Sequence, residues 1–350
     1  MRIPVSLLLA LAAMTIVIAI TPLAIRLAWR LGAIAKPGPR HVHQEPVPRL
    51  GGLAIAIAVL VTLWLAFLLP GPARLLAPNP LLGLTLAAIP ILLLGVIDDM
   101  RGVSALAKIG VQVCAALVLV SFGYGVPLLT NPLGGEFTTA WLNVPFTVFW
   151  VVMVTNAINL IDGLDGLASG VVLIAAMTLW WVGRSHSDFY VMFLAAPLAG
   201  ATFGFLRWNF PRARVFMGDT GSQFLGLALA AASLLENRKG TATVTLLFPL
   251  VALGLPIADS VLAFARRLFR NENVFRADSQ HIHHRLLHLG LSPRGAVLLL
   301  WALSAGLGVV AIALSGRPRA FGWTVLMVLA VVLFVAFECL EALDRRNRDR

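Results

Sequence analysis

The chain has 350 residues, of which 59% are hydrophobic and only 12% charged, and its formal net charge is +11. A mean hydropathy of +0.89, with repeated apolar runs long enough to cross a bilayer, predicts an all-α, polytopic integral membrane protein. The basic residues are divided among short loops, which argues against a nucleic-acid partner, and the two cysteines lie inside apolar runs, which excludes a disulfide framework.

Eleven apolar runs are predicted to cross the membrane as helices within a single domain that covers residues 1–350. They are 3–24, 51–69, 81–97, 105–122, 144–160, 166–183, 189–206, 218–235, 242–264, 295–315 and 321–341. The first run resembles a signal peptide, but no clean cleavage site follows it, so we expect a retained helix. Most of the 27 lysines and arginines fall on one side if residues 25–50 are cytoplasmic. The positive-inside rule then predicts an N-terminus outside and a C-terminus in the cytoplasm.

Several loops on the predicted cytoplasmic side are candidates for an active site. They lie near 25–50, 98–104, 156–168, 207–221 and 265–294. The first of these loops is too rich in proline to be helical, and its turns are expected to hold cations over the site. On the other side, residues 123–143 are rich in glycine and proline with almost no charge, which predicts a plain connecting loop.

Most acidic residues near the predicted spans lie at cytoplasmic ends. They are Asp98, Asp99, Asp162, Asp165, Asp219, Asp259 and Asp278. The adjacent carboxylates of Asp98 and Asp99 repel each other unless a cation lies close by. A solvated helix end is the simpler interpretation of this pair alone. Together with the other motifs, it predicts a site for a divalent metal or a phosphate.

Asn156, Asn159 and Asp162 recur every third residue, so a helix would carry them on one face. Asp165 follows within Asp-Gly-x-Asp-Gly, whose glycines allow the backbone to close around a ligand. Asparagines that only pack helices together are the alternative, but they do not explain the Asp-Gly pairs. Polar groups at membrane depth are costly, which favours a functional interpretation.

The segment 216–222 reads Phe-Met-Gly-Asp-Thr-Gly-Ser and begins the next predicted span. Its acid and hydroxyls suit a helix N-cap. The free backbone amides of a helix N-terminus also favour a phosphate, and Asp219 can hold a metal that bridges to it. Asn209 and neighbouring arginines lie just upstream.

His281, His283 and His284 form the last polar cluster. Three histidines suit zinc or nickel, but no matching cysteine or second histidine cluster exists, and the carboxylates and amides suit Mg²⁺ better. On a helix, His281 and His284 would share a face and His283 would point elsewhere. We therefore expect contacts to phosphate or uridine.

Arginines precede these histidines. Arg276 is expected to contact the substrate, whereas Arg266, Arg267 and Arg270 suit anionic lipid headgroups equally well.

Four motifs together resemble those of the polyprenyl-phosphate N-acetylhexosamine-1-phosphate transferases, over about residues 34–294. The motifs are Asp98-Asp99, Asn156-x-x-Asn159-x-x-Asp162-Gly-x-Asp165-Gly, Phe216-Met-Gly-Asp219-x-Gly-Ser and His281-x-His283-His284. Within the family, the chain looks like the group that starts O-antigen, enterobacterial common antigen or teichoic-acid assembly. His281-Ile-His-His in place of three consecutive histidines, and one more span than the group that uses UDP-MurNAc-pentapeptide, point to that group.

The resemblance implies transfer of N-acetylglucosamine 1-phosphate from UDP-GlcNAc to undecaprenyl phosphate, at the cytoplasmic face of a bacterial inner membrane. The residues it assigns are Asp98, Asp99, Asp162 and His281 to catalysis, Lys108, Asn156, Asn159, Asp165, Asn209, Phe216, Arg276, His283 and His284 to substrate binding, and Asp219 with Asn159 to the metal. The implied cofactor is Mg²⁺, with Mn²⁺ as a substitute, and the implied partners are membrane lipids and a second copy of the chain. Ala35 and His41 depart from the family pattern, in which an acid and a basic residue are common.

Two alternatives remain at this point. Within the family, the donor is instead UDP-GalNAc or UDP-MurNAc-pentapeptide. In another class, a secondary transporter would use membrane carboxylates to bind its coupling ion. A transporter predicts acids near mid-span and paired repeats, whereas the acids here lie at helix ends and no repeat is evident.

Overall fold

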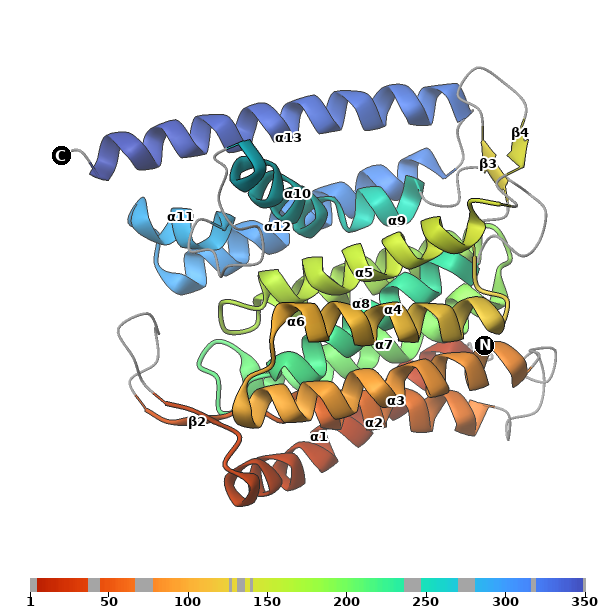
Figure 1. The fold of residues 1–350 in the computed structure, drawn as a ribbon, viewed down its shortest axis with the longest axis vertical. Coiled ribbons are helices and arrows are strands. Elements are labelled where there is room, and N and C mark those ends of the chain that lie inside the picture. The colour runs from red at the N-terminus through yellow and green to blue at the C-terminus, as the bar shows by residue number, and fades with distance from the viewer. Residues whose placement is uncertain are drawn as a thin grey trace.

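The computed structural model describes residues 5–36, 45–66, 78–125, 128–130, 136–138, 141–235, 247–269, 281–315 and 319–348. Most of its helices run side by side along a common direction (Figure 1). In chain order the helices are α1 (Val5–Leu31), α2 (Gly51–Ala66), α3 (Pro78–Arg101), α4 (Ala105–Ser121), α5 (Asn143–Ile161), α6 (Leu167–Ser185), α7 (Phe189–Asn209), α8 (Gly218–Leu235), α9 (Leu247–Ala252), α10 (Gly254–Phe269), α11 (Ile282–His288), α12 (Pro293–Leu314) and α13 (Arg319–Arg348). The predicted all-α class is confirmed.

Six of the described helices, α1, α3, α5, α6, α7 and α12, are long and apolar enough to cross a membrane. Shorter apolar helices are α2, α4 and the Thr324–Cys339 part of α13. The protein is therefore a multi-pass membrane protein, and the count of eleven spans stays a prediction. Figure 1 shows α1 beginning at one end of the bundle and α13 finishing at the other.

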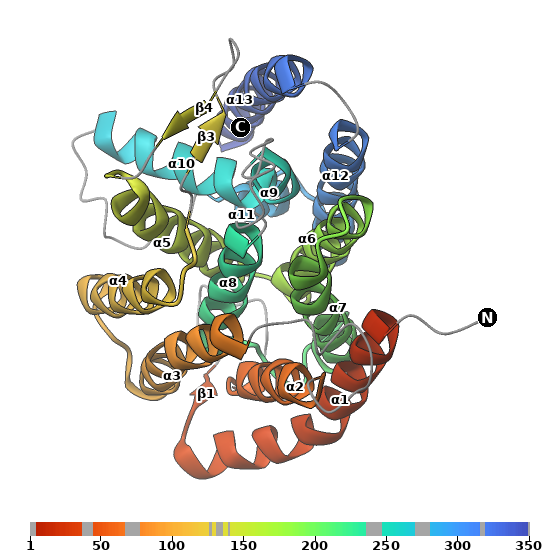
Figure 2. The same ribbon diagram turned by 90° about the vertical axis from the view of Figure 1, so that its right-hand side faces the viewer.

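Helix α8 lies at the centre of the bundle, with α2, α3, α5, α6 and α7 around it (Figure 2). Nearly every described side chain from Phe224 to Leu234 is buried. At its first turn α8 approaches α2 so closely that a side chain on Gly52 would collide with the backbone of Gly221. Small residues allow such close contact between membrane helices, where packing is a main source of stability.

The predicted span 242–264 is wrong as a single helix, because α9 ends at Ala252 and α10 begins at Gly254. In Figure 2, α10 lies across the view, whereas its neighbours are seen along their axes. The break falls just before Pro256, whose ring lacks an N–H and clashes with the preceding turn. The direction of the chain therefore changes between α9 and α10.

Two short antiparallel strand pairs connect helices. The pair β1 (Ile34–Ala35) and β2 (Val47–Pro48) lies within the predicted first cytoplasmic loop. The pair β3 (Leu128–Thr130) and β4 (Glu136–Thr138) lies in the segment predicted to be a connecting loop between two spans, which therefore contains a short strand pair. The cations expected at Lys36 and beyond fall largely in 37–44, outside the described residues.

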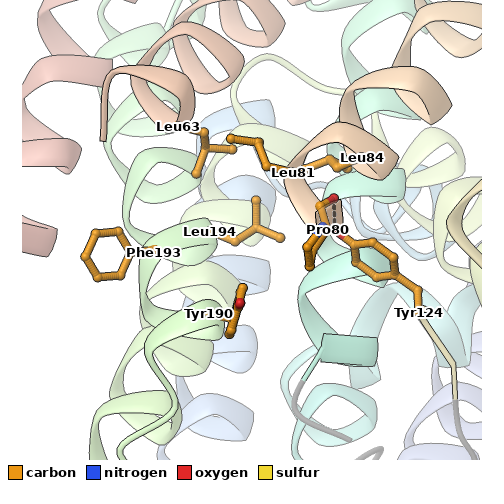
Figure 3. Close-up of a pocket in the computed structure, with 8 residues that line it drawn as sticks. All are labelled: Leu63, Pro80, Leu81, Leu84, Tyr124, Tyr190, Phe193 and Leu194. Carbon is orange, nitrogen blue, oxygen red and sulfur yellow. Dashed lines mark hydrogen bonds between the residues drawn. The ribbon is translucent and has the colours of Figure 1, made fainter. Parts of the chain in front are cut away.

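A small hollow opens between the ends of α2, α3 and α7 (Figure 3). Leu63, Pro80, Leu81, Leu84, Tyr124, Tyr190, Phe193 and Leu194 line it. The Tyr124 hydroxyl donates a hydrogen bond to the Pro80 carbonyl at 2.7 Å, and the other lining side chains are mostly apolar. Pro80 lies in the first turn of α3, whereas Asp98 and Asp99 lie in its last turn. This hollow therefore lies at the far end from the acidic motifs, and its apolar lining does not suit a nucleotide sugar.

Candidate active site

Four polar side chains converge at the end of the bundle that carries β2 and α11. Asp98 ends α3, Lys108 lies in the first turn of α4, Asn159 lies near the end of α5, and Asp219 lies in the first turn of α8. The Lys108 ammonium nitrogen lies 2.5 Å from Asp98 Oδ2 and 3.0 Å from Asp219 Oδ1. The cation expected beside the Asp98-Asp99 pair is therefore Lys108, which also joins α3 to α8.

Asp99 has a different environment from Asp98, although the two are adjacent. Its carboxylate accepts hydrogen bonds from the backbone amides of Asp219 at 2.9 Å and Thr220 at 3.1 Å. The Thr220 hydroxyl donates a third at 2.7 Å. Asp99 therefore caps the N-terminus of α8 from the neighbouring helix. The expectation that these two amides are free to hold a phosphate is wrong, because Asp99 occupies them.

Gly218 makes this cap feasible. Its φ of 70° lies in the left-handed region, and a side chain there would collide with the Arg49 carbonyl and the Asp99 carboxylate. Phe216, two residues before Gly218 and predicted to bind substrate, is half-buried, and its backbone amide donates to the Pro48 carbonyl at 2.8 Å. The first strand pair is thereby fastened to the start of α8.

Asn159 supports Asp219 directly. Its amide nitrogen donates to Asp219 Oδ1 at 2.6 Å and to the Ser222 hydroxyl at 2.8 Å. The geometry thus places Asn159 as a donor to the carboxylate. A role for Asn159 as a metal ligand stays a prediction, because its amide oxygen would have to turn toward the metal.

Asp162 and Asp165 lie in the turn between α5 and α6, which we name the Asp-Gly turn (residues 162–166). Burial, followed by the nearby carboxylates of Asp219 and Asp99, raises the pKa of Asp162 to about 8. Asp165 Oδ2 accepts a hydrogen bond from the Ala213 amide at 2.9 Å. This contact ties the turn to the segment that leads into α8.

Asn209, at the end of α7, holds the same turn by hydrogen bonds from its side chain. Its side-chain oxygen accepts from the Gly166 amide at 2.9 Å and the Ser169 hydroxyl at 3.3 Å, while its nitrogen donates to the Val215 carbonyl at 3.0 Å. Asn209 is buried, and these contacts occupy both ends of its amide. The structure therefore places Asn209 beneath the Asp-Gly turn, and its predicted role in substrate binding stays a prediction.

A layer of three amides lies one helical turn deeper than this cluster, and we name it the amide layer (Gln112, Asn156 and Gln223). The Asn156 amide nitrogen donates to Gln112 Oε1 at 2.6 Å, and Gln112 Nε2 lies 3.4 Å from Gln223 Oε1. Asn156 was predicted to bind substrate, but here it packs within this layer.

Gln112 and Gln223 had no role in the sequence interpretation. Gln112 stands four residues after Lys108, and Gln223 stands four residues after Asp219. Each amide therefore lies on the same helix face as a member of the charged cluster, the name we give to Asp98, Lys108, Asn159 and Asp219. That spacing, together with the cost of amides at membrane depth, is the signal that could have identified them.

The histidines are arranged differently from the helical prediction. His281 precedes α11 in an extended conformation, with φ −63° and ψ 155°. Its ring is parallel to that of His283, with centroids 6.0 Å apart, and His283 in turn contacts His284. The prediction that His281 and His284 share a face is wrong, because only the residues after His281 are helical. We name these three side chains the histidine stack.

His283 is the most enclosed member of the stack, with 1% of its surface exposed. Neither ring nitrogen has a hydrogen-bond partner within the described segments. Burial, followed by the neighbouring His284, lowers the pKa of His283 to about 3. Arg276, the predicted substrate contact, lies outside the described residues.

The donors at this end suit Mg²⁺ chemically. Asp98, Asp99 and Asp219 bring three carboxylates together with a single ammonium, Lys108, so the cluster favours an additional cation. Over the ranges that the structure describes, no group of three or more His, Cys, Asp and Glu side chains is arranged to hold a metal. Mg²⁺ typically uses one or two carboxylates together with substrate phosphates and water.

Comparison with known proteins identifies the class of this site. Residues 81–237 match the model of glycosyl transferase family 4. The chain belongs to this family, and it is a membrane enzyme that transfers a sugar phosphate. The resemblance inferred from its motifs is thereby confirmed, and a secondary transporter is excluded.

Particular relatives extend over nearly the whole chain. It is 37% identical over 327 residues to a probable undecaprenyl-phosphate N-acetylglucosaminyl 1-phosphate transferase of Bacillus subtilis, covering 92% of this chain and 88% of the relative. It is 38% identical over 348 residues to a decaprenyl-phosphate N-acetylglucosaminephosphotransferase of Mycobacterium leprae, covering 92% and 86%. It is 29% identical over 333 residues to an undecaprenyl-phosphate alpha-N-acetylglucosaminyl 1-phosphate transferase of Escherichia coli, covering 90% and 86%.

Proposed function

We propose that the protein transfers N-acetylglucosamine 1-phosphate from UDP-GlcNAc to undecaprenyl phosphate, giving GlcNAc-pyrophosphoryl-undecaprenol and UMP. The names of the three relatives support the sugar, and two of them support the undecaprenyl chain. The observation that carries the chemistry is the bridge of Lys108 between Asp98 and Asp219. It gathers charged groups from three helices at one point.

The reaction joins two anions. An oxygen of the lipid phosphate attacks the phosphorus that bears the sugar, and the bond from that phosphorus to the bridging oxygen breaks as UMP leaves. A phosphate monoester has a second pKa of about 6, so the nucleophile is largely dianionic at neutral pH and needs no strong base. The main barrier is therefore electrostatic repulsion between the two substrates.

Residues of the site address this repulsion by charge and position. Lys108 supplies a fixed positive charge between α3 and α8, and Asp98 holds that ammonium in place. Mg²⁺, held by Asp219 with the pyrophosphate, would supply charge neutralisation and alignment, the main contributions to catalysis of phosphoryl transfer. Asn159 orients the Asp219 carboxylate for this task.

Asp98 and Asp99 have separate roles in this proposal. Asp98 is proposed to orient the lipid phosphate or to take a residual proton, because its carboxylate is paired with Lys108, the positive charge that would meet the phosphate. Asp99 is a positioning residue, because its carboxylate is committed to the first turn of α8. We place Asp162, Asp165, Phe216 and the histidine stack near the nucleotide sugar.

The site is proposed to face the cytoplasm of a bacterial inner membrane. The positive-inside rule supports this orientation, because β1, β2 and the start of α8 adjoin the arginine-rich loops. UDP-sugars are cytoplasmic substrates, which requires the same orientation. Association with a second copy, the role of membrane lipids and the polymer built downstream stay predictions.

Turnover by the purified enzyme tests the donor. The full-length protein in detergent, with undecaprenyl phosphate and Mg²⁺, is given UDP-GlcNAc, UDP-GalNAc or UDP-MurNAc-pentapeptide, and UMP release is measured. UDP-GlcNAc is expected to support the fastest release. Faster release from either alternative would overturn the donor assignment. Label retained on denatured enzyme after incubation with UDP-sugar alone would contradict direct displacement.

A pair of matched substitutions tests the metal residue. Asp219→Asn is expected to abolish UMP release while the protein stays folded. Asp188→Asn is the control, because Asp188 caps α7 at the opposite end of the bundle and asparagine caps helices as well as aspartate does. Full activity of Asp219→Asn would eliminate Asp219 as the metal ligand.

A further inference from the structure

Asp259 is a buried carboxylate that lies outside the charged cluster. It is carried by α10, and 1% of its surface is exposed. Such a carboxylate is costly to bury unless it is paired and hydrogen-bonded. Both of its oxygens are engaged: Oδ2 lies 3.0 Å from His281 Nδ1, and Oδ1 accepts a hydrogen bond from the Ile282 amide at 3.0 Å.

This contact specifies the state of the His281 ring. A carboxylate accepts hydrogen bonds, so Nδ1 must carry a hydrogen where it faces Asp259. In the neutral ring, Nε2 is then the acceptor. Because Asp259 also holds the Ile282 amide, it fixes the backbone at the start of α11 together with the ring.

The histidine stack connects His281 to the Asp-Gly turn through contacts between neighbouring side chains. The rings of His281 and His283 are parallel within 5°. His283 Nε2 lies against Gly163, so closely that a side chain on Gly163 would collide with it. A continuous series of contacts thus runs from Asp259 on α10 to the residue that follows Asp162.

The bend between α9 and α10 determines where Asp259 lies relative to His281. A straight continuation of α9 would carry Asp259 along the bundle, whereas α10 runs across it (Figure 2). Asp259 therefore reaches His281 from a helix whose axis differs from those of the helices that carry the charged cluster.

We propose that Asp259 is a positioning residue, which fixes the tautomer and orientation of His281 and, through the histidine stack, holds the Asp-Gly turn in its working geometry. This inference rests on the proposed function for its kinetic consequence, but its structural claim stands alone. Carboxylates that orient a metal-binding histidine typically contribute about 10–100-fold to activity, which gives the scale for a carboxylate that orients His281. A comparable loss is expected here, chiefly in kcat.

Asp259→Asn is the decisive variant, because it keeps the volume and removes one acceptor. The amide presents a single oxygen, so the hydrogen on Nδ1 or the Ile282 amide is left facing an NH₂ group. The ring is then expected to change to the Nε2–H tautomer. Ser260→Ala is the matched control on the same helix, because the Ser260 hydroxyl donates to the Pro256 carbonyl of its own helix at 2.9 Å.

Nuclear magnetic resonance of ¹⁵N-histidine tests the structural claim without turnover. The chain has seven histidines, and the His281 signals are identified by their loss in His281→Gln. A protonated Nδ1 is expected in the wild type and in Ser260→Ala, and a protonated Nε2 in Asp259→Asn. An Nδ1 state that is unchanged in Asp259→Asn would overturn the proposal.

Kinetics of UMP release test the consequence for catalysis. Asp259→Asn is expected to lower kcat about 10–100-fold with a smaller change in KM for UDP-GlcNAc. The double variant Asp259→Asn/His281→Gln is expected to be no slower than His281→Gln, because the pair acts as a unit. Multiplying losses would show that Asp259 acts independently of His281 and would overturn the proposal. A wild type that releases no UMP from any UDP-sugar would refute the proposed function, while the resonance measurement would still decide the role of Asp259.

Discussion

Asp99 and Thr220 are joined by two hydrogen bonds, one from the Thr220 amide at 3.1 Å and one from its hydroxyl at 2.7 Å, both to Asp99 Oδ2. The pair links the end of α3 to the start of α8. Adjacent acids at a candidate active site are easily assigned one common role. Here Asp98 binds the lysine and Asp99 caps a helix, so the two carboxylates have different functions.

Thr220→Val tests the strength of this cap. The change removes one donor to a buried carboxylate, and hydrogen bonds to charged groups contribute about 1.5–3 kcal/mol each. We expect the free energy of unfolding in detergent to fall by about that amount. Thr155→Val is the control, because the Thr155 hydroxyl has no partner among the described residues. Equal stability of the two variants would contradict the cap.

Gln112→Leu tests the amide layer. It removes the 2.6 Å acceptor of Asn156, whose amide nitrogen keeps its bond to the Val152 carbonyl at 2.8 Å, and it leaves Gln223 Oε1 without its neighbour. An unsatisfied buried polar group costs about 1–3 kcal/mol, and we expect a loss of that order with a lower kcat, because Lys108 lies one turn away on the same helix. Gln223→Leu should cost less, since its Nε2 has no partner within the described part of the chain. The reverse order would show that Gln223 is the more important member of the layer.

Gly163→Ala tests the contact between the Asp-Gly turn and the histidine stack. The added methyl group would collide with His283, and overpacking of this kind costs about 1–3 kcal/mol. We expect a lower unfolding temperature and lower turnover. Gly110→Ala is the control: it lies within α4 with open space around it, and alanine favours a helix by up to about 1 kcal/mol. A harmless Gly163→Ala would show that the stack does not press on the turn.

His283→Leu tests the pH dependence of stability. Because burial lowers the pKa of His283 to about 3, the unfolded chain takes up this proton first, at its ordinary pKa of about 6.5. The contribution of neutral His283 to stability is therefore complete above about pH 6.5 and is lost as the pH falls toward 3. Unfolding temperatures measured from pH 7.5 to 5 should fall less steeply for His283→Leu than for the wild type. The exposed His288, changed to Gln, should keep the wild-type slope.

The sequence allowed the class of protein and the composition of the site to be predicted, for a definite physical reason. Asp98, Lys108, Asn159 and Asp219 all lie at helix ends on one side of the predicted membrane. Helices of similar length that cross the same slab bring such ends together. The positions of the spans and their order along the chain were therefore enough to predict that these four residues converge.

The particular contacts could not be predicted in this way. Whether Asp99 faces a substrate or the amides of α8 depends on the distance between α3 and α8, which close packing beside Gly218 decides. The burial of Asn209, and its bonds to the Gly166 amide and the Val215 carbonyl, depend in the same way on how the surrounding segments pack. The split between α9 and α10 had a local signal in Gly254 and Pro256, which the high hydropathy of the segment obscured.

The enclosure of α8 bears on how this membrane protein tolerates polarity. Five other helices surround α8 and separate it from the bilayer. Its side chains therefore need not be apolar for the sake of contact with lipid. Helix α8 carries Asp219 in its first turn, contains Gln223, and is not among the six described helices that are apolar enough to span by themselves. The outer helices must present apolar residues to the lipid, whereas the residues of α8 must fit the side chains of the helices around it. The effect of a polar substitution in α8 on the free energy of unfolding therefore depends on how the new side chain packs and bonds with its protein neighbours. A scale of membrane-insertion free energies would not give that effect correctly.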